Sequence, residues 1–269
     1  MENRLIVSVS PHLHHKESAD KIMWMVVASL IPAGVAGVFI FGMSAFWVII
    51  LAVASALATE GILQKIARQK VTISDGSAFI TGLLLAYNLP PKVPFWLPIA
   101  GSFFAIFIAK FVFGGLGKNI FNPALAGRAF LIASWPKYMT TFTPTPKILV
   151  WGFTSPDAIT SATPLAMLKE GKLFSRIPYL DLFLGNKAGC IGEVCILMLL
   201  IGAAFLLIKG YISWHIPVTY IFTVGIFTYI FGSTPHLGAG AGFSGDWLFH
   251  ILSGGLVLGA FYMATDYVT

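Results

Sequence analysis

Residues 74–91, SDGSAFITGLLLAYNLPP, contain an apolar run that is too short to cross a membrane as a straight helix. The run from Ala78 to Leu89 holds about a dozen residues, whereas a spanning helix needs about 20. Ser74-Asp75-Gly76-Ser77 precedes it and Pro90-Pro91 ends it. Short apolar segments bounded in this way are typical of broken helices that end inside a membrane protein.

A second short run extends from Pro123 to Trp135, after the sequence GGLGKN at 114–119 and before Pro136. In transporters the free ends of such half-helices bind ligands or ions near the middle of the membrane. The same pattern also fits two re-entrant turns that bind nothing. The two runs therefore predict half-helices, and they leave both interpretations of their ends open.

The rest of the chain has the composition of a membrane protein. Of its 269 residues, 57% are hydrophobic and 10% are charged, and the mean hydropathy is +0.84. A soluble domain carries roughly 25% charged residues, which excludes a soluble cytosolic enzyme and a disordered chain. The longer apolar runs cover residues 22–41, 45–66, 95–113, 190–208, 212–231 and 247–263.

Together these runs predict an all-α polytopic membrane protein with about eight membrane segments, of which two are half-helices. We expect a single membrane domain over residues 1–269. After an amino-terminal segment 1–21 come a first helical group 22–136, an extramembrane segment 137–188 and a second helical group 189–269.

Basic residues in short loops indicate the orientation, because cytoplasmic loops carry an excess of Lys and Arg. The loop after the second run contains three of them: Lys65, Arg68 and Lys70. This places segment 1–21, Lys110 and Lys118 on the cytoplasmic side and segment 137–188 on the opposite side, although 137–188 itself has six basic residues. No cleavable signal peptide precedes the first run.

Several other functions are disfavoured by the residues present. The net charge of +6 comes from basic residues beside apolar runs, without the interleaved aromatics of a nucleic-acid site. The two cysteines, Cys190 and Cys195, are too few for an iron–sulfur or zinc site. His12, His14 and His15 lie close together, but nothing nearby would fix them as metal ligands, so we expect no metal site.

Five short motifs occur in a characteristic order along the chain. They are Ser10-Pro11-His12-Leu13-His14, Ser74-Asp75-Gly76-Ser77-Ala78 with Leu89-Pro90-Pro91, Gly117-Lys118-Asn119-Ile120-Phe121-Asn122-Pro123-Ala124-Leu125-Ala126-Gly127-Arg128-Ala129-Phe130, Ser161-Ala162-Thr163-Pro164-Leu165 and Met263-Ala264-Thr265-Asp266. In this order and spacing they resemble the NqrB/RnfD family of membrane flavoproteins. The resemblance covers residues 8–269, and the early start of the first run makes the chain most similar to the RnfD branch, the D-type subunits of the Rnf ion-translocating electron-transport complex.

The resemblance implies a covalently bound FMN. In this family a flavin transferase outside the cytoplasm joins FMN through its phosphate to a threonine hydroxyl. The matching position is Thr163, with Ser161 in the same motif, whereas Ala162 stands where the family usually has Gly. On the residues alone, Thr163 before a proline is a typical helix N-cap.

The resemblance also implies a riboflavin that is held without a covalent bond near the second half-helix. The matching residues are Asn119 and Asn122, with Asp266 as a further candidate. Asn amides donate and accept hydrogen bonds, which suits the pyrimidine edge of a flavin; both Asn residues are also typical caps of a helix that begins at Pro123. Arg128 is expected either to contact a flavin or phosphate or to serve the packing of the protein.

Acidic residues within apolar runs mark ion pathways in membrane proteins. Four occur here: Glu60, Asp75, Glu193 and Asp266. Glu60 and Glu193 are consistent with a position at the membrane interface. Asp75 and Asp266 are therefore the preferred ion-pathway candidates, although Asp75 also suits a helix cap.

The function implied by the resemblance is electron relay in an ion-translocating ferredoxin:NAD⁺ oxidoreductase of a bacterial or archaeal cell membrane. Ferredoxin oxidation and NAD⁺ reduction fall to other Rnf subunits, because this chain has neither a cysteine cluster nor a nucleotide-binding glycine motif. The expected partners are those subunits, the flavin transferase and membrane lipid, with no nucleic acid. The chain alone is expected to have no complete catalytic activity and no catalytic residue of its own.

Three other interpretations remain at this level. One is the corresponding subunit of a Na⁺-translocating NADH:quinone reductase, which has a longer amino-terminal extension. The second is a small-solute channel without redox function, and the third is a scaffold that has lost its flavins. Family members also continue into further spans beyond the position of Thr269, so the second helical group is expected to be shortened.

Overall fold

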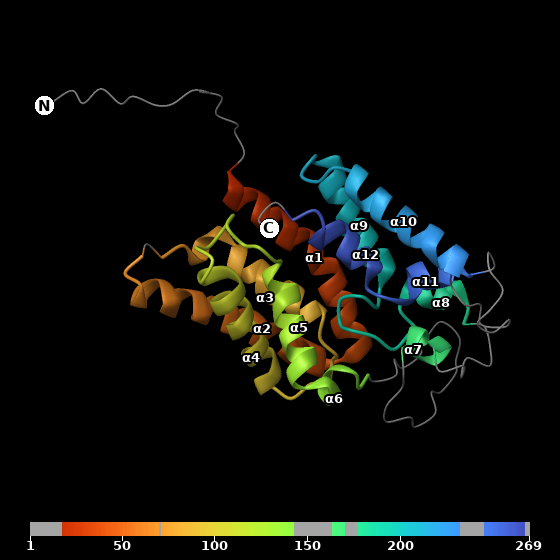
Figure 1. Ribbon diagram of the computed structural model, residues 1–269, viewed down its shortest axis with the longest axis horizontal. Coiled ribbons are helices and arrows are strands. Elements are labelled where there is room, and N and C mark those ends of the chain that lie inside the picture. The colour runs from red at the N-terminus through yellow and green to blue at the C-terminus, as the bar shows by residue number, and fades with distance from the viewer. Residues whose placement is uncertain (1–17, 70, 143–162, 170–176, 232–244, 267–269) are drawn as a thin grey trace, which may run out of the picture.

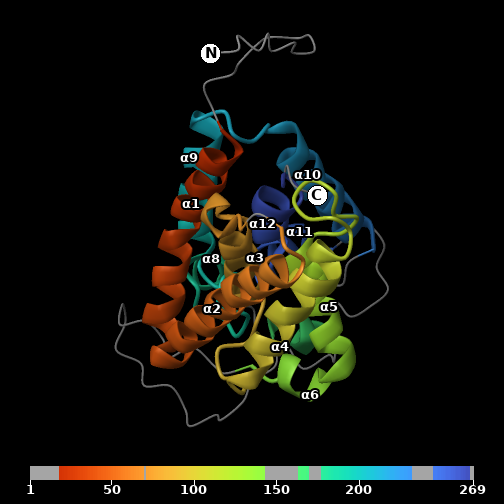
Figure 2. The same ribbon diagram turned by 90° about the vertical axis from the view of Figure 1, so that its left-hand side faces the viewer.

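The computed structural model describes residues 18–69, 71–142, 163–169, 177–231 and 245–266. Within these ranges the chain forms helices and no β-strand. Ser161 and the three amino-terminal histidines lie outside the described residues. The helices are arranged as two groups that meet along α1 and α9 (Figures 1 and 2).

The chain begins with two long apolar helices, α1 (Ala19–Phe41) and α2 (Met43–Ile66), which confirm the first two predicted runs. Ser18 caps α1 by accepting a hydrogen bond from the Lys21 amide at 3.2 Å. Among the described residues, these are the two helices that are long and apolar enough to cross a membrane. Gly42 joins them with φ +77°, a conformation that L residues with a side chain rarely adopt.

The first predicted half-helix is confirmed as α3 (Ser77–Tyr87), which follows the short 3₁₀ turn η1 (Ile73–Asp75). Ten of its eleven residues are buried, because it runs through the interior against α2. Gly82 allows this close approach: a Cβ there would lie 2.8 Å from the Cα of Val53. The indole of Trp24 donates to the carbonyl of Ser74 at 3.1 Å, which ties η1 to α1.

The second predicted half-helix is confirmed as α5 (Pro123–Ser134). It follows α4 (Trp96–Phe104), which continues without a break into the π-helical stretch η2 (Ala105–Phe111). The short α6 (Pro136–Met139) ends the first group.

The second group comprises α7 (Pro164–Lys169), α8 (Tyr179–Leu184), α9 (Ile196–Ile208), α10 (His215–Phe231), α11 (Trp247–Ser253), α12 (Leu256–Leu258) and the π-helical η3 (Gly259–Met263). One predicted boundary was wrong, because the run expected to span from residue 190 becomes helical only at Ile196. The run expected over 247–263 is also interrupted, since the adjacent Gly254 and Gly255 separate α11 from α12.

Residues 185–195 form a buried loop that explains the late start of α9. The amides of Ile191 and Gly192 donate to the carbonyls of Leu89 and Tyr87 at 3.1 and 3.0 Å. These carbonyls lie at and just beyond the carboxyl end of α3, where helices lack internal donors. The loop is therefore apolar because it is packed in the interior against a broken helix.

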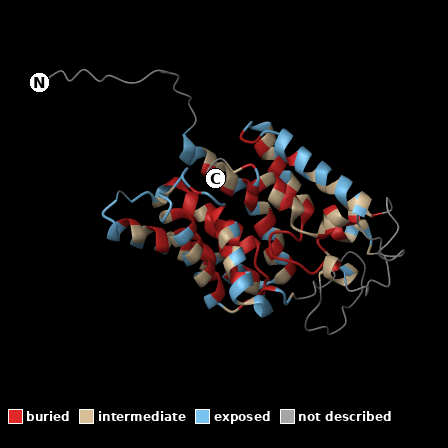
Figure 3. Ribbon diagram, viewed as in Figure 1, coloured by how far each residue is buried: buried red, intermediate tan, exposed pale blue. Residues whose placement is uncertain are grey.

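Large apolar side chains remain exposed on the outer helices, above all on α10 (Figure 3). Phe222 and Phe231 are 66% and 77% exposed, and Phe39 of α1 reaches 85%. Buried residues follow the inner helices and the loop (Figure 3). An apolar outer surface around a packed interior is the distribution expected where the surroundings are lipid or other subunits.

Candidate functional site

A polar cavity of about 510 Å³ opens between α2, η1 and the end of η2. Its lining includes Glu60, Gln64, Thr72, Asp75 and Lys110. Two of these, Glu60 and Lys110, are each only 4% exposed, so they form the buried floor of the cavity.

Lys110 and Glu60 form an ion pair at this floor. The ammonium of Lys110 lies 2.8 and 2.7 Å from the two carboxylate oxygens of Glu60. Gln64 supports the pair by donating to Glu60 Oε1 at 3.0 Å and to Thr72 Oγ1 at 2.9 Å. Two expectations were wrong: Glu60 is not at an interface, and Lys110 is not a loop residue.

Asp75 caps the first half-helix. Its Oδ1 accepts hydrogen bonds from the amide and hydroxyl of Ser77 at 2.8 and 2.6 Å. The same Ser77 hydroxyl accepts from Lys110 at 2.7 Å. The capping interpretation of Asp75 is therefore confirmed, and the cap is joined through Ser77 to the buried ion pair.

A smaller inner pocket of about 20 Å³ lies on the other side of Lys110. Ser77, Thr81, Asn119, Pro123 and Asp266 line it together with Lys110. The beginnings of both half-helices thus meet at one place, together with Asn119 and Asp266 from the sequence motifs. Asn122 completes the group by donating from Nδ2 to Asp266 Oδ2 at 3.3 Å.

The two asparagines have different roles. Asn122 caps α5, because its Oδ1 accepts from the amides of Ala124 and Leu125 at 3.0 and 3.3 Å. Asn119 makes no such contact: both polar atoms of its side chain are buried and have no hydrogen-bond partner among the described residues. A buried amide without partners costs free energy, so Asn119 is the residue of this group that is suited to receive a ligand.

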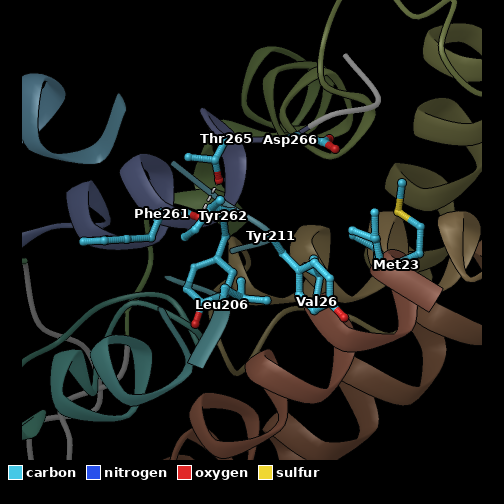
Figure 4. Close-up of a pocket in the computed structure, with 11 residues that line it drawn as sticks. Met23, Val26, Leu206, Tyr211, Phe261, Tyr262, Thr265 and Asp266 are labelled. Carbon is cyan, nitrogen blue, oxygen red and sulfur yellow. Dashed lines mark hydrogen bonds between the residues drawn. The ribbon is translucent and has the colours of Figure 1, made fainter. Parts of the chain in front are cut away.

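The space beside Asn119 limits what it can hold. A cavity of about 20 Å³ has the size of a water molecule, whereas cofactor pockets are of the order of 300–1,000 Å³. The neighbouring pocket between α1, α9 and η3 has about 30 Å³ and is also lined by Asp266, near Tyr262 and Thr265 (Figure 4). The polar atoms therefore fit the edge of a flavin, while the ring itself requires side chains such as Met23 to move.

Arg128 bridges the two half-helices. Its Nη1 donates to Asn88 Oδ1 at 2.6 Å, and Asn88 in turn donates to the carbonyl of Leu84 at 2.7 Å. Arg128 does not line the inner pocket. Its observed contact supports the packing interpretation.

Thr163 lies directly before α7, where its hydroxyl accepts a hydrogen bond from the amide of Ala166 at 3.3 Å. The capping interpretation is thus confirmed for this residue. Thr163 is partly exposed, and α7 packs on α11. The structure therefore places Thr163 in the second group, apart from the Asn119 pocket.

The buried loop 185–195 holds two charged residues that the sequence did not place there. Glu193 accepts from the amide of Cys190 at 2.9 Å and is 9% exposed, so its expected interface position was wrong. Lys187 is 3% exposed and donates to the carbonyl of Leu252 at 2.5 Å. Burial lowers the pKa of Lys187 to about 8, which nearby Glu193 only partly offsets.

Comparison with known proteins places these features in a family. The model of the NQR2, RnfD, RnfE family matches residues 6–269. The chain belongs to this family. The match covers both half-helices, the inner pocket and Thr163.

Three relatives of the NQR2, RnfD, RnfE family show what the chain is similar to, and each is the D-type subunit of its complex. The chain is 48% identical to that of the proton-translocating ferredoxin:NAD(+) oxidoreductase complex of Clostridium ljungdahlii, over 100% of this chain and 80% of that protein. It is 45% identical to that of the Na(+)-translocating ferredoxin:NAD(+) oxidoreductase complex of Acetobacterium woodii, over 100% and 79%. It is 33% identical to that of the ion-translocating oxidoreductase complex of Citrobacter koseri, over 98% and 82%. Like these family members, it is a membrane protein.

Proposed function

We propose that this chain is the D-type membrane subunit of an ion-translocating ferredoxin:NAD⁺ oxidoreductase complex. The observation that carries the proposal is the family match over residues 6–269, together with the 45–48% identity to two such subunits. The subunit relays electrons between partner subunits, and that relay is coupled to movement of Na⁺ or H⁺. Partner subunits oxidise ferredoxin and reduce NAD⁺.

FMN is attached through its phosphate to the hydroxyl of Thr163 by a flavin transferase. Thr163 suits attachment because it is partly exposed and lies at the edge of a described helix rather than in the core. Ser161 belongs to the same motif. Attachment would remove the hydroxyl proton but leave an oxygen, so the contact with the Ala166 amide can persist in the flavinylated protein.

A riboflavin is held without a covalent bond at the inner pocket. Asn119 offers it an unused donor and an unused acceptor, and Asn122 and Asp266 hold the adjacent segment in place. A flavin supplies one- and two-electron chemistry when it is bound. The residues of this chain orient its polar edge and exclude water from it.

The subunit crosses the membrane several times, with segment 1–21 in the cytoplasm and segment 137–188 on the opposite side. The basic loop with Lys65 and Arg68 supports this orientation. It also puts Thr163 on the side where the transferase acts. A passive channel is less well supported, because the polar cavity ends at the Lys110–Glu60 pair.

Fluorescence of the denatured subunit on a gel tests the covalent attachment. Wild type, Thr163→Val and the control Thr160→Val are each expressed with a flavin transferase. We expect fluorescent bands for wild type and Thr160→Val and a dark band for Thr163→Val. A dark wild-type band, with the transferase active on another substrate, or a fluorescent Thr163→Val band would overturn the proposal.

A further inference from the structure

Lys110 lies between the open polar cavity and the closed inner pocket, and it lines both. On the cavity side it contacts both carboxylate oxygens of Glu60. On the inner side it contacts the hydroxyl of Ser77 at the beginning of α3. One ammonium group therefore joins a water-accessible space to the pocket that contains Asn119.

The charges around this ammonium come from several elements. Glu60 belongs to α2, Asp75 to η1, Asp20 to α1, and Asp266 follows η3. Among them Glu60 is the group in direct contact, and the pair is almost fully buried. The amino-terminal ends of α3 and α5 point their positive ends at the inner pocket, which disfavours a second positive charge there.

This balance depends on the charge in the inner pocket. A negative charge arriving beside Asn119 would compensate the two helix ends and attract the ammonium of Lys110. A lysine has a flexible four-carbon stem and a compact charge, so a small displacement of Nζ suffices. Such a displacement weakens its contact with Glu60 and leaves a carboxylate facing the cavity.

We propose that Lys110 is an exchangeable counter-ion that couples negative charge in the inner pocket to uptake of one monovalent cation at Glu60. This rests on the proposed function, which supplies the electron from reduced ferredoxin through partner subunits. One electron enters the pocket and one cation enters the cavity, so charge balances. When the electron leaves for the next carrier, the ammonium returns to Glu60 and the cation is released.

The oxygen atoms around Lys110 suit either of two cations. Glu60 Oε1, Glu60 Oε2 and Ser77 Oγ all lie within 2.8 Å of Nζ. Hard oxygen ligands bind Na⁺, and a carboxylate also binds a proton. The similar relatives are named for proton and for Na⁺ translocation, so the experiment measures both ions.

The test uses the intact complex in inverted membrane vesicles. The variants are Lys110→Gln, Lys110→Arg and the double variant Glu60→Gln/Lys110→Gln, with the exposed Lys118→Gln as the matched control. The double variant leaves no unpaired buried charge, so it remains informative where Lys110→Gln fails to assemble. The readouts are Na⁺ and H⁺ uptake per electron, content of non-covalent flavin, and the cation dependence of that flavin's midpoint potential.

We expect uptake per electron to fall at least fivefold in Lys110→Gln and in the double variant, and the midpoint potential to lose its dependence on the transported cation. Lys110→Arg keeps most of both, and Lys118→Gln matches wild type. Normal flavin content with unchanged uptake and unchanged cation dependence in the double variant overturns the role of Lys110 alone. Absence of non-covalent flavin from the wild-type complex overturns this inference together with the inner flavin site.

Discussion

Gly192 lies against Tyr87 so closely that a Cβ on Gly192 would be 2.2 Å from the Cβ of Tyr87. The Gly192 amide also donates to the Tyr87 carbonyl at 3.0 Å, and the Tyr87 hydroxyl donates to the carbonyl of Leu30 at 2.7 Å. The buried loop, the end of α3 and helix α1 are thus joined through one side chain. Only a residue without a side chain fits at position 192.

Gly192→Ala is therefore expected to destabilise the protein. The added methyl group overlaps the tyrosine, and overpacking of this kind costs about 1–3 kcal/mol or more. The measurement is thermal unfolding in detergent, followed by tryptophan fluorescence. Gly259→Ala is the control, because a Cβ there meets nothing within 4 Å. Equal unfolding temperatures for the two variants would contradict the packing argument.

Substitutions at Asn119 and Asn122 should separate ligand binding from helix capping. Asn119→Leu removes a buried amide without partners, so stability should stay the same or rise, while non-covalent flavin is lost with about a tenfold weaker affinity. Asn122→Ala removes the cap of α5 and should cost about 1 kcal/mol. Unfolding temperature and extracted flavin are measured on the same samples. A large loss of stability in Asn119→Leu would sink this assignment.

Much of the first helical group could be predicted from sequence because its breaks are marked locally. Asp75 and Asn122 cap their half-helices, and Pro90 and Pro136 follow the ends. These signals lie within a few residues of the boundary that they determine. The third interrupted segment also carries a signal, the pair Gly254-Gly255, because adjacent small residues often break helices.

The remaining features depend on contacts between distant residues. Lys110 meets Glu60 across 50 positions, and neither residue indicates its partner. The buried loop before α9 is as apolar as a spanning helix, so hydropathy alone does not distinguish the two. The separate roles of Asn119 and Asn122 likewise depend on which amides each side chain reaches.

Lys187 should make stability depend on pH in the alkaline range. Its pKa is about 8 in the folded protein and 10.5 as the ordinary value. Between these values the unfolded chain holds a proton that the folded protein has released, so stability rises with pH by up to about 1.4 kcal/mol per unit. Below pH 8 the penalty of burying the charge is constant.

The check on Lys187 is the difference in unfolding temperature between wild type and Lys187→Met from pH 7 to 10. Wild type should gain stability relative to the variant as pH rises above 8. The exposed Lys137→Met controls for loss of a positive charge. A difference that stays constant across this range would argue against a neutral buried lysine.

The Lys110–Glu60 pair should show strong coupling in a double-mutant cycle of stability. Lys110→Met leaves the Glu60 carboxylate buried without its counter-charge, and breaking a buried pair in this way costs about 3–5 kcal/mol. Glu60→Gln/Lys110→Met removes both charges and should recover most of that loss, because an uncharged pair needs no compensation. Thermal unfolding of the four proteins in detergent gives the coupling. Additive losses would mean that water in the adjoining cavity already screens the two charges, and the pair would then be too weak to hold Lys110 at Glu60.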